Sequence, residues 1–271
     1  MKYFNYLIYI YYNYINYIWK KKKLKNPFFS IVTVVKNDEV NIQNTIGSII
    51  SQNYKNFEYI VIDGKSTDRT LKIVNKYKNK ISHILSEKDR GIYFAMNKGI
   101  KLAKGTFLLF VNSGDLITKD ALGIIYDLYT KNKEIDFIFG TVKRHYTTNS
   151  IIKSGYDKFR LNYNFDFATS HSTGFFIKLK SLNKIGKFDT RYKCSADYDL
   201  YYRAIIKNKL KGISTNKNKI IGIMKSGGYS SKTSFFQHLL EETRIRYNNN
   251  QNIFFIFLIF CNAIIKYIIK K

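Results

Sequence analysis

Residues 107–115 pass abruptly from an apolar segment to short polar residues and a single carboxylate. The segment 107–111 is continuously apolar, and Asn112, Ser113, Gly114 and Asp115 follow at once. This pattern is typical of a buried parallel strand that delivers a charged side chain to the carboxyl edge of an α/β sheet. One Asp there is enough to hold Mg²⁺ or Mn²⁺, because such ions complete their shell with water and substrate phosphate oxygens. Asn112 can bind through water or to a ribose, although a simple strand-terminating turn would also use these residues.

Asp63 ends a second strand-like segment, residues 57–62, which is apolar apart from Glu58, and is followed by Gly64 and the polar run 65–70. A carboxylate at the mouth of a sheet can accept the ring N–H of a uracil- or guanine-type base. The structural alternative is an ordinary loop in which residues 66–68 cap the next helix. That alternative explains the hydroxyl residues but not the position of Asp63.

A charged pair, Asp89 and Arg90, stands immediately before Gly91 and a helical pattern. Gly91 permits a tight entry into the helix, and the pair can then reach the phosphate end of a bound nucleotide. The alternative is a surface loop with no ligand.

Two further carboxylates, Asp197 and Asp199, fall near the start of a helix predicted from about Ala196. They lie about 200° apart around that helix, so they cannot share one role. Asp197 can point toward a ligand as a general base, while Asp199 can pair with Arg203 at the (i, i+4) spacing. The alternative makes both of them acids that interact favourably with the helix dipole. Asp63, Asp115 and Asp197 together suggest a site that binds a nucleotide diphosphate through a metal.

The elements that position these residues alternate between strand and helix. Strands are predicted over 29–35, 57–62, 81–85 and 107–111, and helices over 39–51, 68–79 and 92–104, with Gly105 as the carboxyl cap of the last. Strands that alternate with helices of 10 to 15 residues predict βαβ units and a mostly parallel central sheet flanked by helices. The fold class is therefore α/β.

Composition limits the partners of this chain. Its 271 residues carry 46 basic and 19 acidic side chains, a formal net charge of +27. Few of the basic residues are Arg, and the lysines are spread along the chain, so the charge alone does not indicate nucleic-acid binding. Cys194 and Cys261 show neither metal-ligand spacing nor a disulfide framework, which fits a reducing compartment.

Both ends of the chain are apolar and basic. Residues 1–26 are rich in Tyr and Ile and end in a lysine cluster, and residues 232–271 pass from an amphipathic to a hydrophobic helical pattern. Asn and Lys interrupt both runs, so neither predicts a spanning helix. We expect an in-plane membrane anchor, and the alternative is a helix packed on the globular domain or in an oligomer interface. No convincing secretory signal precedes them.

The motifs occur in one order that resembles glycosyltransferase family 2, in the branch that makes bacterial capsule, lipopolysaccharide and exopolysaccharide sugars. The resemblance covers residues 27–231 and rests on segments 29–37, 63–68, 91–99, 112–115 and 196–199. It implies a GT-A fold with a Rossmann-like sheet and a divalent cation, Mg²⁺ or Mn²⁺, held by Asp115. Asp197 matches the residue that deprotonates the acceptor. Positions that match donor-binding motifs of the family are Thr33, Val35, Glu39, Asp63, Asp89, Arg90, Asn97 and Asn112.

The resemblance also implies an activity. It indicates an inverting transferase that moves one sugar from a nucleotide-diphosphate sugar to a lipid-linked or growing surface glycan. The Gln-x-x-Arg-Trp signature of processive synthases is missing, which favours single transfer. We expect a cytoplasmic protein, peripheral on the inner face of the cell membrane. Phe94 and Ala196 replace acidic residues of the family pattern, so the alternative is a catalytically weak or inactive sugar-nucleotide-binding protein on the same fold.

Overall fold

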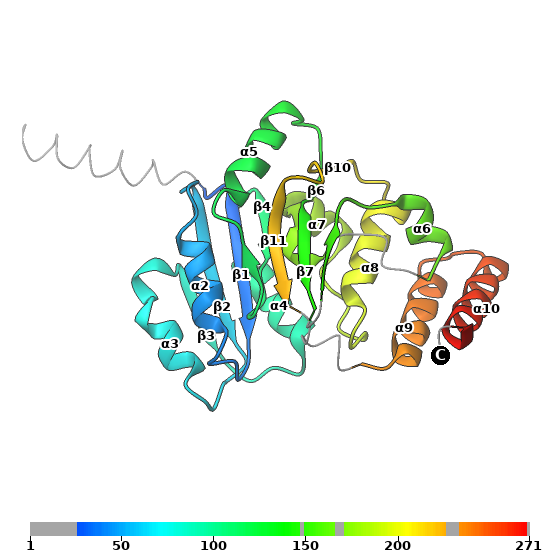
Figure 1. Cartoon of the computed structure of the whole chain (residues 1–271), viewed down its shortest axis with the longest axis horizontal. Coiled ribbons are helices and arrows are strands. Elements are labelled where there is room, and N and C mark those ends of the chain that lie inside the picture. The colour runs from blue at the N-terminus through cyan, green and yellow to red at the C-terminus, as the bar shows by residue number, and fades with distance from the viewer. Residues whose placement is uncertain (1–25, 147–148, 166–170, 226–232, 270–271) are drawn as a thin grey trace, which may run out of the picture.

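A mostly parallel sheet forms the centre of the molecule (Figure 1). The computed structural model describes residues 26–146, 149–165, 171–225 and 233–269. Within these residues, seven strands form the central sheet in the order β10-β6-β9-β4-β1-β2-β3. Their bounds are β1 Phe29–Val35, β2 Phe57–Asp63, β3 His83–Ser86, β4 Phe107–Phe110, β6 Phe137–Phe139, β9 Phe175–Lys178 and β10 Gly212–Ser214. Strand β9 runs antiparallel to its neighbours β4 and β6, and the other pairs are parallel.

The parallel strands β4, β1, β2 and β3 bring their carboxyl ends to one edge. Val35 at the end of β1 is level with Asp63 at the end of β2, and Asp63 is level with Ser86 of β3. On the other side of β1, Val32 is level with Phe110, the last residue of β4. The polar residues that follow β4 and β2 therefore meet at this edge, which we call the carboxyl edge.

A second sheet of four strands in the described residues packs beside the central one, in the order β5-β11-β7-β8. Strands β11 and β7 are parallel, whereas β5 and β8 are antiparallel to their partners. The sequence patterns did not predict this sheet. The bounds of its strands are β5 Leu116–Ile117, β7 Thr141–His145, β8 Ser150–Lys153 and β11 Ile220–Lys225.

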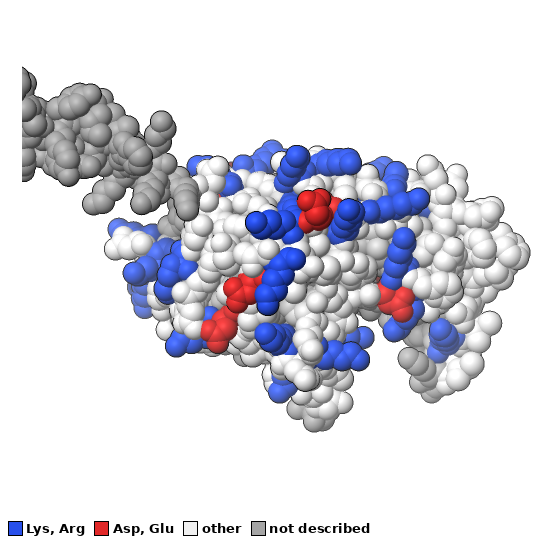
Figure 2. Space-filling model, turned by 90° about the horizontal axis from the view of Figure 1, so that it is seen from above, with Lys and Arg blue, Asp and Glu red and all other residues white. Residues whose placement is uncertain are grey.

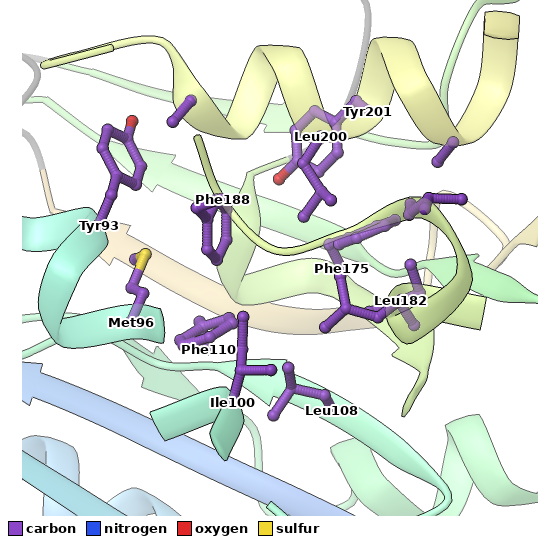
Figure 3. Close-up of a cluster of buried hydrophobic side chains, with 14 of the residues drawn as sticks. Tyr93, Met96, Ile100, Leu108, Phe110, Phe175, Leu182, Phe188, Leu200 and Tyr201 are labelled. Carbon is purple, nitrogen blue, oxygen red and sulfur yellow. The ribbon is translucent and has the colours of Figure 1, made fainter. Parts of the chain in front are cut away.

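Helices cover both faces of the central sheet. The α-helices are α2 Ile42–Ile50, α3 Thr70–Lys76, α4 Ile92–Leu102, α5 Ala121–Lys131, α6 Lys158–Tyr163, α7 Leu179–Ile185, α8 Ala196–Tyr202, α9 Phe235–Asn248 and α10 Ile253–Ile269. Two short 3₁₀ helices, η1 Lys78–Lys80 and η2 Ser172–Gly174, and one π-helix, η3 Arg203–Lys207, accompany them. Alternate β1 residues face opposite sides, so Val32 packs in the cluster with α4 and α8, and Ile31 in the cluster with α2 and α5. The α4–α8 cluster is drawn in Figure 3.

The predicted alternation of strands and helices is confirmed, but one predicted cap is wrong. Helix α4 ends at Leu102 with Ala103 as its cap, so Gly105 does not close it. Gly105 instead lies against β1, where a Cβ atom would come within 2.5 Å of the Ser30 backbone nitrogen. The glycine therefore permits close chain approach rather than a left-handed helix end.

The C-terminal part of the chain forms two helices, as the sequence predicted. Helices α9 and α10 lie at the opposite end of the molecule from α3 (Figure 1), and the ring of Phe235 stacks on that of Tyr267 at 4.2 Å. Among the described residues, no helix has both the length and the apolarity needed to cross a bilayer. The predicted N-terminal segment lies outside the described residues except for Asn26.

Candidate active site

Asp115 lies buried just beyond β4, between the two sheets. Its Oδ2 accepts a hydrogen bond of 2.6 Å from the hydroxyl of Thr173, which belongs to η2. The Nδ1 atom of His171 lies 3.8 Å from the same oxygen. The antiparallel return of the chain into β9 thus places residues 171–173 against the turn that follows β4.

Burial controls the protonation of this pair. It raises the pKa of Asp115 to about 7, although the Thr173 hydrogen bond and the positive charge of Arg144 both act to lower it. Burial, together with Arg144, lowers the pKa of His171 to about 4. The imidazole is therefore neutral near pH 7, and Arg144 is the fixed positive charge near the carboxylate.

The residues of this turn fit a divalent cation. Asp115 offers a carboxylate, and Oδ1 of Asn112 is buried without a hydrogen-bond partner. The described part of the chain contains no group of three or more His, Cys, Asp or Glu residues able to hold a metal. Mg²⁺ and Mn²⁺ need only one or two protein carboxylates when substrate phosphates supply the remaining oxygens. Asp115 and Asn112 therefore form a suitable donor set, completed by a ligand.

Asp63 lies at the end of β2 and is fully buried. The Ser86 hydroxyl donates to it at 2.6 Å, and the Ser66 backbone N–H and hydroxyl donate to it as well. Ser66 also accepts a hydrogen bond from the Asn37 N–H, so it binds two loops of the carboxyl edge and does not cap α3. A carboxylate has about four lone-pair sites, which leaves capacity for a further donor.

The β1 candidates are placed differently from one another. Thr33 is buried, with its hydroxyl donating to the Val111 carbonyl at 2.7 Å and accepting from Tyr59. Val35 is buried in the sheet core, so neither side chain is exposed at the carboxyl edge. Glu39 lies beyond β1 and binds the Arg69 guanidinium through both carboxylate oxygens at 3.1 Å.

The candidate residues around α4 differ in whether their side chains already bind other parts of the protein. Asp89 forms an ion pair with Lys98. Arg90 is exposed, next to Gly91, which has a φ of 149°. Asn97 is engaged within the protein, since its side chain both donates to the Phe188 carbonyl and accepts from the Phe188 N–H. Asn97 thus fixes the loop before α8 to α4.

Asp197 lies in the first turn of α8, partly buried against the start of α4. Its Oδ1 accepts hydrogen bonds from the Tyr198 N–H at 2.9 Å and from the Tyr93 hydroxyl at 3.3 Å. Figure 3 shows the Tyr93 hydroxyl pointing toward α8, with Phe188 beside the tyrosine ring. Burial raises the pKa of Asp197 to about 6, which leaves the carboxylate ionised at neutral pH but more basic than an exposed Asp.

Asp199 has the separate role that its position on the helix predicted. It is buried, and its Oδ2 accepts a hydrogen bond of 2.8 Å from Arg203 Nε. The same guanidinium donates to the carbonyls of Ile185, Gly186 and Lys187. Asp199 therefore anchors α8 to the preceding loop.

The sequence patterns did not predict several neighbours of the two acids. Arg144 comes from β7 of the second sheet, and its Nε atom is buried without a hydrogen-bond partner. Thr173 and Tyr93 stand 58 and 104 residues away from the carboxylates that they bind. Tyr93 belongs to the 91–99 motif and Thr173 lies close to His171 in the sequence, and these were the only signals available. Neither signal predicts a contact with Asp197 or Asp115.

Comparisons with known proteins identify the family of this chain. Residues 30–188 match the profile described as Glycosyl transferase family 2. A PGL/p-HBAD biosynthesis glycosyltransferase of Mycobacterium bovis is 30% identical over 181 residues, which span 65% of this chain and 69% of the relative.

Solved structures show the same fold at lower identity. Staphylococcus aureus TarS, residues 1–349 with UDP-GlcNAc, superposes with a TM-score of 0.67 at 21% identity, covering 87% of this chain and 71% of the other. The mannosyltransferase PcManGT from Pyrobaculum calidifontis, with GDP-Man and Mn²⁺, gives 0.61 at 15% identity, covering 92% and 75%. The fold class is thus GT-A. With the family profile matching more than half of its length, the chain belongs to glycosyltransferase family 2 and is a glycosyltransferase.

Proposed function

We propose that the protein is an inverting, non-processive transferase that moves one sugar from a nucleotide-diphosphate sugar to a lipid-linked or growing surface glycan. The names of its relatives support the donor class, since TarS was solved with UDP-GlcNAc and PcManGT with GDP-Man. A relative from Bacillus spizizenii named as a poly(ribitol-phosphate) beta-glucosyltransferase supports a surface-glycan acceptor. The transferase domain is proposed to span residues 27–231, with 232–271 as a helical tail and 1–26 as a membrane-associating segment.

The observation that carries this proposal is the placement of two carboxylates, Asp115 and Asp197, beside one edge of the sheet. Each lies next to the carboxyl edge, Asp115 after β4 and Asp197 against Tyr93 at the start of α4. Their surroundings differ, since Asp115 neighbours the buried unpartnered Oδ1 of Asn112, whereas Asp197 accepts hydrogen bonds from the Tyr198 N–H and the Tyr93 hydroxyl. That difference supports separate duties, one toward a metal and one toward a proton.

The donor is proposed to lie along the carboxyl edge. Asp63 would accept the ring N–H of the base, and Asp115 with Asn112 would hold the divalent cation. That cation, when bound, supplies positive charge that neutralises the leaving diphosphate. The remaining donor-binding positions are proposed to be Thr33, Val35, Glu39, Asp89, Arg90 and Asn97.

The chemical step is a single displacement. Asp197 takes the proton of the acceptor hydroxyl, and the freed oxygen forms a bond to the anomeric carbon from the face opposite the diphosphate. The bond between that carbon and the diphosphate oxygen breaks, and the electron pair leaves with the nucleoside diphosphate. One displacement inverts the anomeric configuration. A positioned base contributes about 10²- to 10⁴-fold to such a rate.

The helix α10 supports a place at a membrane surface. Its apolar side chains Phe254, Phe257 and Ile268 are largely exposed, and the end of the molecule that it forms is mostly free of charged side chains in Figure 2. The rest of that face carries scattered Lys and Arg. An exposed apolar helix beside basic side chains suits the headgroup region of an anionic bilayer, on the cytoplasmic face of the cell membrane.

A thermal-shift screen tests the donor assignment. The purified protein is heated with UDP, GDP and their sugar conjugates, each with and without Mn²⁺. We expect one nucleotide diphosphate to raise the Tm, with a larger rise when Mn²⁺ is present. A screen in which no nucleotide diphosphate changes the Tm would contradict the proposal.

Phe94 motivates a second candidate function. It stands in the first turn of α4, where the family pattern has an acidic residue, and it is half-buried there. On this account the protein binds a sugar nucleotide without transferring the sugar. Binding in the thermal-shift screen without consumption of the donor would favour it.

A further inference from the structure

The helix α9 delivers a carboxylate to the backbone that leads into α8. Both oxygens of Glu241 accept hydrogen bonds there, one from the Lys193 N–H at 2.7 Å and the other from the N–H groups of Cys194 and Ser195 at 3.0 Å. The thiol of Cys194 lies 3.2 Å from the second oxygen. Three consecutive backbone N–H groups thus converge on a single carboxylate.

These N–H groups belong to the residues just before the proposed base. Asp197 follows Ser195 by two positions, and α8 has no side-chain cap at Ser195. Charge-assisted hydrogen bonds of this kind are about twice as strong as neutral ones. Glu241 therefore fixes the backbone direction from which the Asp197 side chain leaves the first turn of α8.

Glu241 is itself held rigidly, because α9 is bound to the domain at a second point. Arg246 is buried and donates to the carbonyls of Leu161, Asn162 and Asn164, while its guanidinium lies over the ring of Tyr198 at 5.6 Å. Asn249 donates to Asp199 on α8 at 3.2 Å. The helix is thus bound both to the residues before α8 and to Tyr198 and Asp199 within it.

We propose that Glu241 is a positioning residue for the transfer reaction and acts through Asp197. This inference rests on the proposed function, in which Asp197 is the base. It gives α9, which lies outside the residues that match the family profile, a role in positioning the base. A displacement of about 1 Å in a reacting group can cost on the order of 100-fold in rate.

The variant Glu241→Gln tests the proposal because it removes the charge and one acceptor while keeping the shape. We expect kcat to fall roughly 10- to 100-fold while the Kd for the donor stays within about twofold. The double variant with Asp197→Asn should have the same residual rate as Asp197→Asn alone, because both changes act through the Asp197 carboxylate.

Asp136→Asn is the matched control. Asp136 likewise accepts a backbone N–H, from Lys211 at 2.9 Å, and a hydroxyl, from Ser181 at 2.6 Å, but it lies before β6. We expect this control to lower the Tm and leave kcat unchanged. A Glu241→Gln variant that behaves like the control would overturn the inference. So would a Glu241→Gln substitution that lowers the rate by the same factor in the Asp197→Asn variant as in the wild type.

Three further outcomes can be told apart. If Glu241→Gln does not fold, Glu241→Asp is used instead. This variant keeps the negative charge on a side chain that is shorter by one methylene, and its kcat is judged by the same criteria. If Asp197→Asn transfers sugar at the wild-type rate, the base assignment itself is wrong. If Asp197→Asn is inactive but folded Glu241 variants keep the wild-type kcat, only the role of Glu241 is wrong.

Discussion

At the scale of single residues, the surroundings of Asp197 determine how its activity should depend on pH. Burial raises the pKa of Asp197 to about 6, and the hydrogen bonds from Tyr198 and Tyr93 oppose that rise. The base works only when ionised, so we expect kcat to rise with pH through about 6 and then level off. A kcat profile from pH 4.5 to 8.5 measures this. A rate that stays constant down to pH 4.5 would contradict the assignment.

The buried acid Glu242 should make the stability of the protein depend on pH. This residue of α9 is buried, and burial raises its pKa from 4.5 to about 8, with Arg246 opposing the rise and Asp197 adding to it. Between those values the folded protein binds more protons at Glu242 than the unfolded chain, so the free energy of unfolding falls as pH rises. The loss from this group is on the order of 3–5 kcal/mol.

The variant Glu242→Gln keeps the shape of the protonated acid without its titration. We expect its Tm to equal that of the wild type near pH 5 and to exceed it near pH 8. The comparison is made by thermal unfolding in matched buffers. A Tm difference that is the same at both pH values would show that the titration of Glu242 does not act on stability.

The sequence predicted the positions of several acidic residues but not the residues that contact them. Asp115 and Asp63 follow apolar strands, so local pattern alone placed them at one edge of the sheet. The separation of Asp197 from Asp199 followed from helix geometry and is confirmed by the Arg203 ion pair. Thr173, Arg144 and Glu241 reach the site through tertiary packing, which no local spacing encodes.

At the scale of elements, the packing of α4 on β1 depends on one glycine. A Cβ atom at Gly99 would overlap the side chain of Val32, which is fully buried, whereas one at Gly47 in α2 would meet nothing within 4 Å. We expect Gly99→Ala to destabilise the protein by about 1–3 kcal/mol through overpacking. The control Gly47→Ala should stabilise it by about 0.5–1 kcal/mol, because alanine has the higher helix propensity.

Urea unfolding of the two glycine variants measures this difference. Equal effects of the two substitutions, in either direction, would contradict the close approach of α4 to β1.

Element boundaries show where local patterns stop being informative. The alternation of strand and helix was predictable over residues 29–111 because β1, β2 and β4 are largely apolar and buried on both faces, whereas each helix between them buries one face. The helix predicted over 68–79 is shorter, Thr70–Lys76: Asp68 and Arg69 before it hydrogen-bond to Glu39, and the 3₁₀ helix η1 follows it. The second sheet was not predictable, because β5 has two residues and β11 pairs with β7 from more than 70 positions away.

At the scale of the whole molecule, α10 presents an apolar surface on a strongly basic protein. The exposed fractions of Phe257 and Ile268 are 62% and 65%. We expect the protein to sediment with vesicles that contain anionic lipid and to be released by salt only in part, since apolar burial persists when charge is screened.

The double variant Phe257→Glu and Ile268→Glu should weaken sedimentation with anionic vesicles by about tenfold or more. Ile152→Glu is the control, because Ile152 is also exposed, at 55%, but lies on β8. If both proteins sediment as well as the wild type, α10 does not bind the membrane.

The central claim is that Asp197 accepts the proton of the acceptor. The most direct measurement compares Asp197→Asn with Asp199→Asn for release of nucleoside diphosphate from the donor, in the presence of a glycan acceptor, and for donor binding. We predict that Asp197→Asn lowers kcat by about 10²- to 10⁴-fold with an unchanged donor Kd. Asp199→Asn should lower the stability and keep most of the kcat, because Asp199 serves the Arg203 ion pair. Wild-type turnover in Asp197→Asn would contradict the account.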